Sequence, residues 1–290
     1  MTVLSATDAR VAVKARTRSV DGWLLAGIPG VVFLLVFFAW PLAQVLVRSL
    51  VDPSPQNYVT FLQTPAYMQI LLQTFQIAAV VTLVCLLLGY PYAYLLSKTS
   101  GLSRTILLAV VLLPIWTSFL VRSVALQTWL QDTGVINSLL MNAGIISEPL
   151  PLIRTSLGVT VGMTQILLPF MILPLFSVMQ RVRPDLLKAA ASLGAPPRRA
   201  FFTVYLPQTL PGIISGSLLV FVISLGFFVV PAILGGTEGS MLSKLIVDMV
   251  GRSEFGMAST LAAILLFATA VILAIGSRFT NIRDLVGGGK

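Results

Sequence analysis

The chain has 290 residues, of which 57% are hydrophobic and 10% charged, and its mean hydropathy of +0.95 is far outside soluble-protein usage and predicts an integral membrane protein. It contains no histidine and one cysteine, Cys85, which excludes His-based catalysis, His/Cys zinc sites and intrachain disulfides. The net charge of +9 does not indicate nucleic-acid binding, because the charges lie between apolar segments rather than on a basic stripe with aromatic platforms.

Six apolar runs are long enough to cross a bilayer, whose hydrocarbon core of about 30 Å needs about 20 helical residues. They cover residues 23–47, 70–96, 106–126, 156–178, 211–233 and 257–277. The first run is too long for a signal-peptide core and no A-x-A cleavage site follows it, so we predict an uncleaved helix behind a basic tail. Pro169 and Pro174 interrupt the fourth run and Pro231 the fifth, so we expect both helices to pack against protein.

Arg122, in the third run, is the only ionisable group near a span on its outer half. Its side chain either reaches the membrane interface, as long basic side chains near helix ends do, or contacts an anionic or zwitterionic substrate or a partner subunit. Other candidates for a substrate pathway are polar or aromatic residues in or beside the spans, although such residues more often serve in packing. They are Trp116, Gln127, Trp129, Gln165, Phe227 and Phe228.

The segment 179–210 is the least apolar part of the middle of the chain and holds five basic residues. Pro184 suits a first helical position, Asp185 favours the positive end of a helix dipole, and "LLKAAASL" consists of strong helix formers. Gly194 supplies a left-handed C-terminal cap, and the two prolines after it forbid continuation. We predict a second short helix over 197–206 that ends before Pro207.

After the fifth run, glycines and an amphipathic pattern mark two further features. Gly226 and the "LGG" at 234–236 are predicted close-packing or hinge positions that could form an outer gate. The connection 240–250 has apolar residues at helical spacing, and we expect a helix lying on the outer interface.

The distribution of positive charge predicts the orientation. Of the 19 Lys and Arg residues, 14 fall in 1–22, 97–105, 179–210 and 278–290, which lie on one side of the six spans. The positive-inside rule therefore places both termini and the 179–210 loop in the cytoplasm. The expected organisation is a basic tail (1–22), a first transmembrane helix (23–50), a core with five spans (69–277) that contains the cytoplasmic loop 181–207, and a C-terminal tail (278–290).

The spacing of the loop carries a family resemblance. Read as KAA-x3-G-x9-V-x-LP, it resembles the EAA loop in the permease subunits of bacterial ABC importers, and it lies two spans from the C-terminus as that loop does. The resemblance implies a coupling helix that docks on a separate ATP-hydrolysing subunit, with Arg198 and Arg199 available for acidic groups or lipid phosphates. Lys188 stands where the family usually has Glu, so the ion pair of that Glu is not implied here. The matching positions are Lys188, Ala189, Ala190, Gly194, Val204, Leu206 and Pro207.

Three further stretches, 88–97, 112–146 and 224–236, resemble the same family, and within it the spermidine/putrescine permeases. The resemblance implies an all-α type I importer fold with six transmembrane helices, in a bacterial cytoplasmic (inner) membrane. The implied partners are two ATP-binding subunits, a second permease chain, which is usually a different one in this subfamily, a periplasmic solute-binding protein and membrane lipid. No G-x-x-x-x-G-K-[ST] phosphate loop is present, so ATP and Mg²⁺ are expected on the partner ATPase, and no cofactor or catalytic site on this chain.

The substrate and the mode of transport leave alternatives open. The resemblance favours a small polar organic solute, polyamine-like first, moved by ATP hydrolysis on a partner subunit. No span contains an Asp or Glu, which weakens the case for a polyamine, although partners could supply carboxylates. Opines, aminophosphonates and other zwitterionic or anionic solutes are alternatives. A stand-alone secondary transporter or channel is the rival mode, but it would usually carry an ion-coupling carboxylate. An intramembrane enzyme would need paired carboxylates or a Ser/Lys constellation, which the spans lack.

Overall fold

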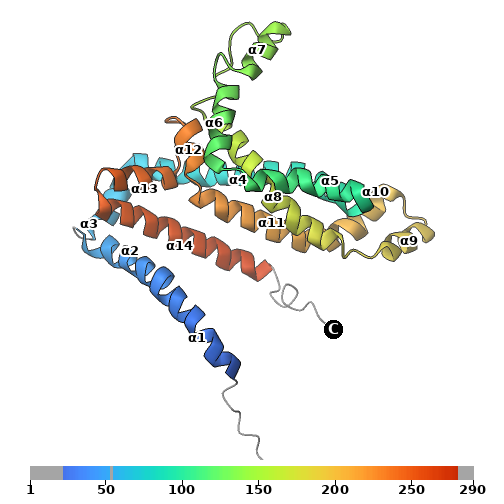
Figure 1. Cartoon of the computed structure of the whole chain (residues 1–290), viewed down its shortest axis with the longest axis horizontal. Helices are drawn as coiled ribbons and strands as arrows, with labels where there is room; N and C mark the ends of the chain where they lie inside the picture. The colour runs from blue at the N-terminus through green and yellow to red at the C-terminus, as the bar shows by residue number, and fades with distance from the viewer. Residues whose placement is uncertain (1–21, 53–54, 280–290) are drawn as a thin grey trace, which may run out of the picture. The chain divides into compact units, whose positions relative to one another are not determined.

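The computed structural model describes residues 22–52 and 55–279, and within them the chain is helical with no strand (Figure 1). The α-helices are α1 (Gly22–Leu34), α2 (Trp40–Val51), α3 (Gln56–Gln63), α4 (Pro65–Lys98), α5 (Gly101–Leu112), α6 (Phe119–Leu130), α7 (Val135–Asn142), α8 (Ser156–Met179), α9 (Pro184–Ser192), α10 (Pro197–Ala200), α11 (Leu206–Gly226), α12 (Val229–Leu234), α13 (Leu242–Gly251) and α14 (Phe255–Phe279). Two π-helical turns, η1 (Leu35–Ala39) and η3 (Phe201–Tyr205), and a 3-10 turn, η2 (Leu113–Trp116), join some of them. The predicted basic tail and most of the C-terminal tail lie outside the described residues.

The chain divides into two compact units, Met1–Val45 and Leu46–Lys290. The described part of the first unit is an apolar helix interrupted by η1, in which the Phe33 and Phe37 ring centroids lie 4.8 Å apart. Helices α3 to α14 all lie in the second unit.

Five helical segments of the described chain are long and apolar enough to cross a membrane. A sixth crossing is formed if the bent pair Gly101–Trp116 and Phe119–Asn142 counts as one span. The predicted number of spans therefore agrees with the structure. The five segments are Gly27–Val51, Pro65–Lys98, Ser156–Met179, Pro197–Gly226 and Phe255–Gly276.

The third span is not the straight helix predicted over 106–126. The helix ends at Trp116 and resumes at Phe119 after a bend of 99°. Pro114 lacks an amide hydrogen, η2 forms a tighter turn around it, and Thr117 adopts an extended conformation with ψ 146°. The second half, α6 and α7, therefore leaves the direction of α5, as Figure 1 shows.

The fifth span also differs from the prediction, because it occupies Pro197–Gly226 and α12 is a separate short helix. The helix that was expected to end before Pro207 continues through this residue into α11. The π turn η3 absorbs the proline: the Leu206 amide donates to the Phe201 carbonyl, and the Gln208 side chain donates to the Val204 carbonyl at 2.9 Å. Pro231 accordingly lies in α12, not inside a span.

The core is built from α4, α8 and α11, with α8 the most buried span. Pro169 and Pro174 lie inside an unbroken α8 whose apolar window is 56% buried, which confirms that this helix packs against protein. Met171 of α8 is enclosed by two glycines. A Cβ atom at Gly89 would meet its side chain at 3.0 Å, and one at Gly216 would meet its Sδ at 2.9 Å. These glycines let three helices approach closely.

The amphipathic helix predicted over 240–250 is present as α13, but its apolar face is covered by protein. Met241, Leu242 and Met249 are buried, and the last two belong to a cluster with α3 and α14. The N-terminus of α13 is tied to α4, because the Leu242 amide donates to Thr74 Oγ1 at 2.8 Å. These contacts fix α13 on the helical core, whereas Val250 on the same helix is 45% exposed. That the helix lies on the outer interface stays a prediction.

Candidate functional site

The loop between α8 and α11 has the predicted helix and corner. Pro184 begins α9 and Asp185 lies in its first turn. The helix ends in a Schellman motif, in which the Ala195 amide donates to the Ala190 carbonyl at 3.0 Å and the Gly194 amide to the Ala191 carbonyl at 2.9 Å. Gly194 has φ +77°, so its lack of a Cβ atom is what makes this corner possible.

One face of α9 is apolar and uncovered. Leu186 is 42% exposed, Ala189 is exposed, and Leu193 is 88% exposed, with i, i+3 and i+7 spacing. Sequence reasoning selected Ala189 but missed the two leucines, although the spacing alone could have indicated them. An exposed apolar stripe of this kind is typical of a surface that binds another protein.

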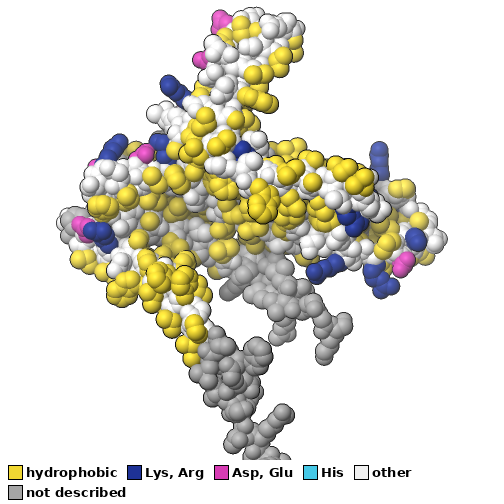
Figure 2. All heavy atoms as spheres, in the orientation of Figure 1, with side chains coloured by type: hydrophobic (Ala, Val, Ile, Leu, Met, Phe, Trp, Pro, Cys, Tyr) yellow, Lys and Arg dark blue, Asp and Glu magenta, His cyan; other side chains and the backbone are white. Residues whose placement is uncertain are grey.

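Basic side chains surround this stripe. Lys188, Arg198 and Arg199 are exposed, and the exposed pair Arg183 and Asp185 lies 3.9 Å apart, too far and too solvated to add much stability. Figure 2 shows dark blue side chains over this end of α9 and α10. The loop therefore presents an apolar stripe with a positively charged rim.

The other face of the loop rests on an aromatic cluster. The Tyr94 ring lies edge-on to the rings of Phe201 and Tyr205, with centroids 6.0 and 5.3 Å away. Lys98 Nζ lies 5.4 Å from the Tyr94 ring centroid and 5.6 Å from that of Tyr205. These rings and Leu187 of α9 together line a cavity of about 310 Å³. The predicted positions Val204 and Leu206 are half-buried and Pro207 is exposed.

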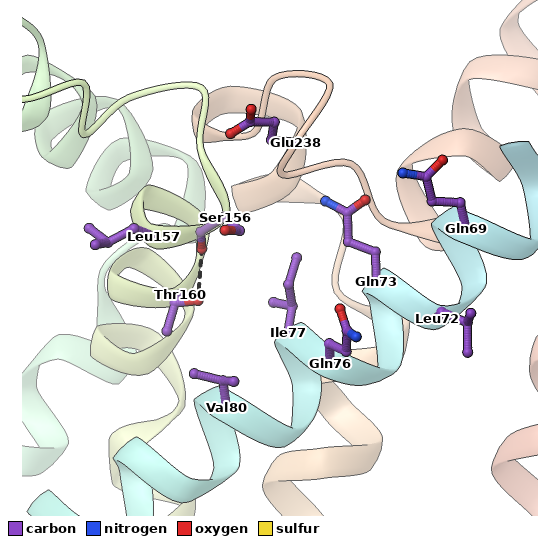
Figure 3. Close-up of a pocket in the computed structure, with 10 residues that line it drawn as sticks. All are labelled: Gln69, Leu72, Gln73, Gln76, Ile77, Val80, Ser156, Leu157, Thr160 and Glu238. Carbon is purple, nitrogen blue, oxygen red and sulfur yellow. Dashed lines mark hydrogen bonds between the residues drawn. The ribbon is translucent and has the colours of Figure 1, made fainter.

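A groove of about 750 Å³ lies away from the loop, at the beginnings of α4 and α8 (Figure 3). Gln69, Gln73 and Gln76 enter it from one side of α4, and Glu238 from the turn after α12. Ser156 and the residues that follow it on α8 form the facing wall. The other lining residues are Leu72, Ile77, Val80, Leu157 and Thr160.

The polar groups of the groove have few partners within the described chain. Thr160 Oγ1 donates to the Ser156 carbonyl at 2.7 Å, as Figure 3 marks, but none of the three glutamine side chains makes a hydrogen bond to a described residue. Glu238 is the only ionisable group among the described lining residues. The sequence prediction missed this site, although three glutamines at i, i+4 and i+7 in an apolar run were a usable signal.

Arg122 lies outside the groove, on the first turns of α6. Its guanidinium is 5.1 Å from the Phe119 ring centroid, and Nη2 donates to the Thr117 carbonyl at 3.4 Å. The Nε and Nη1 atoms are buried and have no partner in the described chain. The Phe119 ring in turn meets Phe227 edge-on at 5.7 Å, so Arg122 and Phe227 belong to one neighbourhood.

The other predicted pathway residues are scattered. Trp116 is 88% exposed, Gln127 is half-buried, and neither lines the groove. A Cβ atom at Gly226 would meet nothing within 4 Å, so close packing does not explain this glycine. At Gly236, in contrast, it would meet the Arg154 carbonyl oxygen at 2.7 Å, so the chain does approach closely there. The exposed candidates that remain are Trp129, Gln165 and Phe228.

The described residues offer no metal centre. Within residues 22–52 and 55–279, no group of three His, Cys, Asp or Glu residues is placed to hold a metal ion. Cys85 is buried within the core. The groove offers amides, hydroxyls and one carboxylate, which can make hydrogen bonds and ion pairs.

Comparison with known proteins identifies the family. Residues 22–284 match the model of the binding-protein-dependent transport system inner membrane component. The spermidine/putrescine transport system permease protein PotB of Haemophilus influenzae is 37% identical over 232 residues, covering 77% of this chain and 79% of that protein. The molybdenum transport system permease protein ModB of Mycobacterium bovis is 30% identical over 248 residues, covering 84% and 90%.

A solved structure supports the same fold. One chain in the crystal structure of a bacterial alginate ABC transporter, in complex with an alginate pentasaccharide-bound periplasmic protein, superposes with a TM-score of 0.73. The two chains are 16% identical, and the match covers 89% of this chain and 94% of that one. The chain therefore belongs to the family of binding-protein-dependent transport system inner membrane components, as a multi-pass inner-membrane permease of a bacterial ABC importer.

Proposed function

We propose that this chain forms part of the membrane path for a small polar organic solute, a polyamine by preference, and that ATP hydrolysis on a partner subunit drives transport. The observation that carries the proposal is the exposed stripe Leu186, Ala189 and Leu193 beside the fixed corner at Gly194. An apolar stripe on a short rigid helix suits insertion into a cleft of an ATP-binding subunit. Movement of that subunit would then reach α11, because α10, η3 and α11 form one continuous segment.

The proposed assembly contains two ATP-binding subunits, a second permease chain and a periplasmic solute-binding protein. ATP and Mg²⁺ would be held by the ATP-binding subunits. The name of the Haemophilus influenzae relative supports spermidine or putrescine as substrate, and the carboxylate of Glu238 in the groove is consistent with a cation. That carboxylate would attract a cation. It would repel the anionic groups of opines, aminophosphonates and other zwitterionic or anionic solutes.

We also propose that both termini and the loop 181–207 lie in the cytoplasm. Basic residues lie at the end of the second unit that carries α9: Lys98 is beside Tyr94 and Tyr205, Arg104 is beside Phe176, and Arg181 follows α8. The positive-inside rule assigns such an end to the cytoplasm. A periplasmic reporter enzyme fused after Lys290 is expected to be inactive, whereas a fluorescent protein at the same position is expected to fold. Activity of the periplasmic reporter would contradict this orientation.

Co-purification with the ATP-binding subunit tests the docking surface. Burial of a leucine side chain is worth about 1.5–3 kcal/mol, and a buried unpaired carboxylate costs more. Leu193→Asp is therefore expected to weaken the association by more than about tenfold. Leu62→Asp on α3 is the control, because Leu62 is also exposed, at 68%, but lies far along the chain from the loop.

Equal recovery of the ATP-binding subunit with Leu193→Asp and Leu62→Asp would show that α9 does not dock. Solute uptake by the purified chain alone, driven by an ion gradient, would favour a stand-alone secondary transporter. ATP-dependent uptake by the reconstituted assembly, lost with Leu193→Asp, supports the proposal.

A further inference from the structure

We propose that the groove between α4 and α8 binds a linear aliphatic polyamine, with Glu238 pairing one ammonium group and the α4 glutamines accepting hydrogen bonds from another. This inference rests on the proposed function and assigns residues to the substrate. It differs from the sequence-based candidates, since none of the aromatic residues or Arg122 lines this groove.

The three glutamines form a polar row along α4 that an extended polyamine could follow. Gln69, Gln73 and Gln76 lie on one side of α4, and a helix rises about 1.5 Å per residue, so the row extends over about 10 Å. Their amides make no hydrogen bond to a described residue, and Gln69 and Gln76 are exposed while Gln73 is half-buried, so all three can accept from a ligand in the groove. Each side-chain carbonyl can accept from an ammonium, which carries three donors in its primary form.

The charge of the groove selects a cation. Among the described residues that line the groove, Glu238 is the only ionisable one, and none is Lys or Arg. A carboxylate in a concave, partly apolar wall attracts cations and raises their local concentration, whereas it repels anions. Arg122, whose Nε and Nη1 atoms are buried without a hydrogen-bond partner in the described chain, is not among the lining residues, so it does not offset Glu238 within the groove.

Apolar residues complete the match to a polyamine. Ile77 and Val80 lie toward the space between α4 and α8 (Figure 3), and Leu72 and Leu157, each more than half exposed, line the groove at its edges. Methylene segments of an amine chain can cover these side chains, while the ammonium groups meet Glu238 and the amides. A metal cation would leave the apolar wall uncovered, and a zwitterion would bring a carboxylate toward Glu238. A linear polyamine therefore fits the groove better than either.

The test uses the reconstituted assembly with its ATP-binding subunits, second permease and binding protein. Glu238→Gln is expected to lower ATP-dependent spermidine uptake by about tenfold, because a charge-assisted hydrogen bond becomes a neutral one. Glu238→Asp is expected to restore most of the uptake. Glu148→Gln is the control, since Glu148 is exposed and does not line the groove.

A second readout does not depend on transport. In a Cys85→Ala background, Gln73→Cys places one thiol in the groove, and spermidine is expected to slow its reaction with a cationic methanethiosulfonate reagent. Gln63→Cys on α3 serves as the unprotected control. The cationic reagent should also react faster than an anionic one, and Glu238→Gln should reduce that preference.

The outcomes separate the two proposals. If the intact assembly takes up no solute with ATP, the proposed function is wrong. If it takes up spermidine while Glu238→Gln matches Glu148→Gln and spermidine gives no protection at Gln73→Cys, the groove assignment is wrong and the function stands. Efficient cross-linking of the Gln73→Cys thiol to the second permease in the resting assembly would also overturn the assignment, because a protein partner would then fill the groove.

Discussion

Replacing Gly194 by valine perturbs the docking loop at its corner and nowhere else. The residue has φ +77°, and a Cβ atom there would meet nothing within 4 Å. The penalty is therefore confined to the backbone, where a left-handed conformation costs an L-residue about 1–2 kcal/mol, and a β-branched residue at least as much. A penalty of this size shifts the equilibrium away from the observed corner by about 5–30-fold.

If α9 transmits force through this corner, Gly194→Val should leave the chain inserted and folded but lower transport by a similar factor. The assay is ATP-dependent uptake into proteoliposomes, measured together with ATP hydrolysis, so that solute moved per ATP is obtained. We expect this ratio to fall by up to about 5–30-fold, because the strain acts on the link between the subunits and this factor is the most that the population of the corner can change.

Two variants control for strain and for side-chain volume. Gly144→Val introduces the same side chain at φ +68° in another open position, on the turn after α7, and should leave coupling unchanged. Gly194→Asn also adds a side chain, but asparagine tolerates the left-handed conformation, so most of the coupling should return. Normal transport per ATP with Gly194→Val, or an equal loss with Gly144→Val, would refute the mechanical role of the corner.

Two further predictions concern packing and the buried guanidinium. Gly216→Leu should lower the thermal midpoint in detergent, because a Cβ atom there meets Met171 Sδ at 2.9 Å and overpacking costs about 1–3 kcal/mol. Gly226→Leu is the control, because its Cβ atom has open space and the midpoint should not change. Equal midpoints for the two variants would contradict the packing described for α8 and α11. Arg122→Met removes the buried Nε and Nη1 atoms that lack hydrogen-bond partners, so the isolated chain should be as stable or more so. If the guanidinium contacts a substrate or a partner subunit in the assembly, uptake should fall because that group loses its donor; unchanged uptake would indicate that Arg122 serves only locally.

The sequence predicted the spans and the loop because both depend on local chemistry. Long apolar runs must be helical in a bilayer, and Gly194 with two following prolines defines a corner whatever surrounds it. The break at Thr117 and the passage through Pro207 were missed, since a proline can either end a helix or be absorbed by a 3-10 or π turn. Tertiary contacts decide between these outcomes.

The groove could not be assembled from sequence for a different reason. Glu238 and Gln73 are far apart in the chain, and only the packing of α8 against α4, with α12 against α8, brings both to one cavity. The sequence-based candidates were Arg122 and polar or aromatic residues in or beside other spans, whereas this groove uses amides of α4 and a carboxylate from a turn. The polar row on α4 was visible in the sequence, but its function depends on what faces it.

A structure of the assembled transporter, with its ATP-binding subunits, tests the central claim most directly. The account predicts that Leu186, Ala189 and Leu193 are buried in a cleft of an ATP-binding subunit, with the Gly194 corner unchanged. A structure in which residues 184–206 are surrounded by water, with no nucleotide-binding subunit in contact, would contradict it.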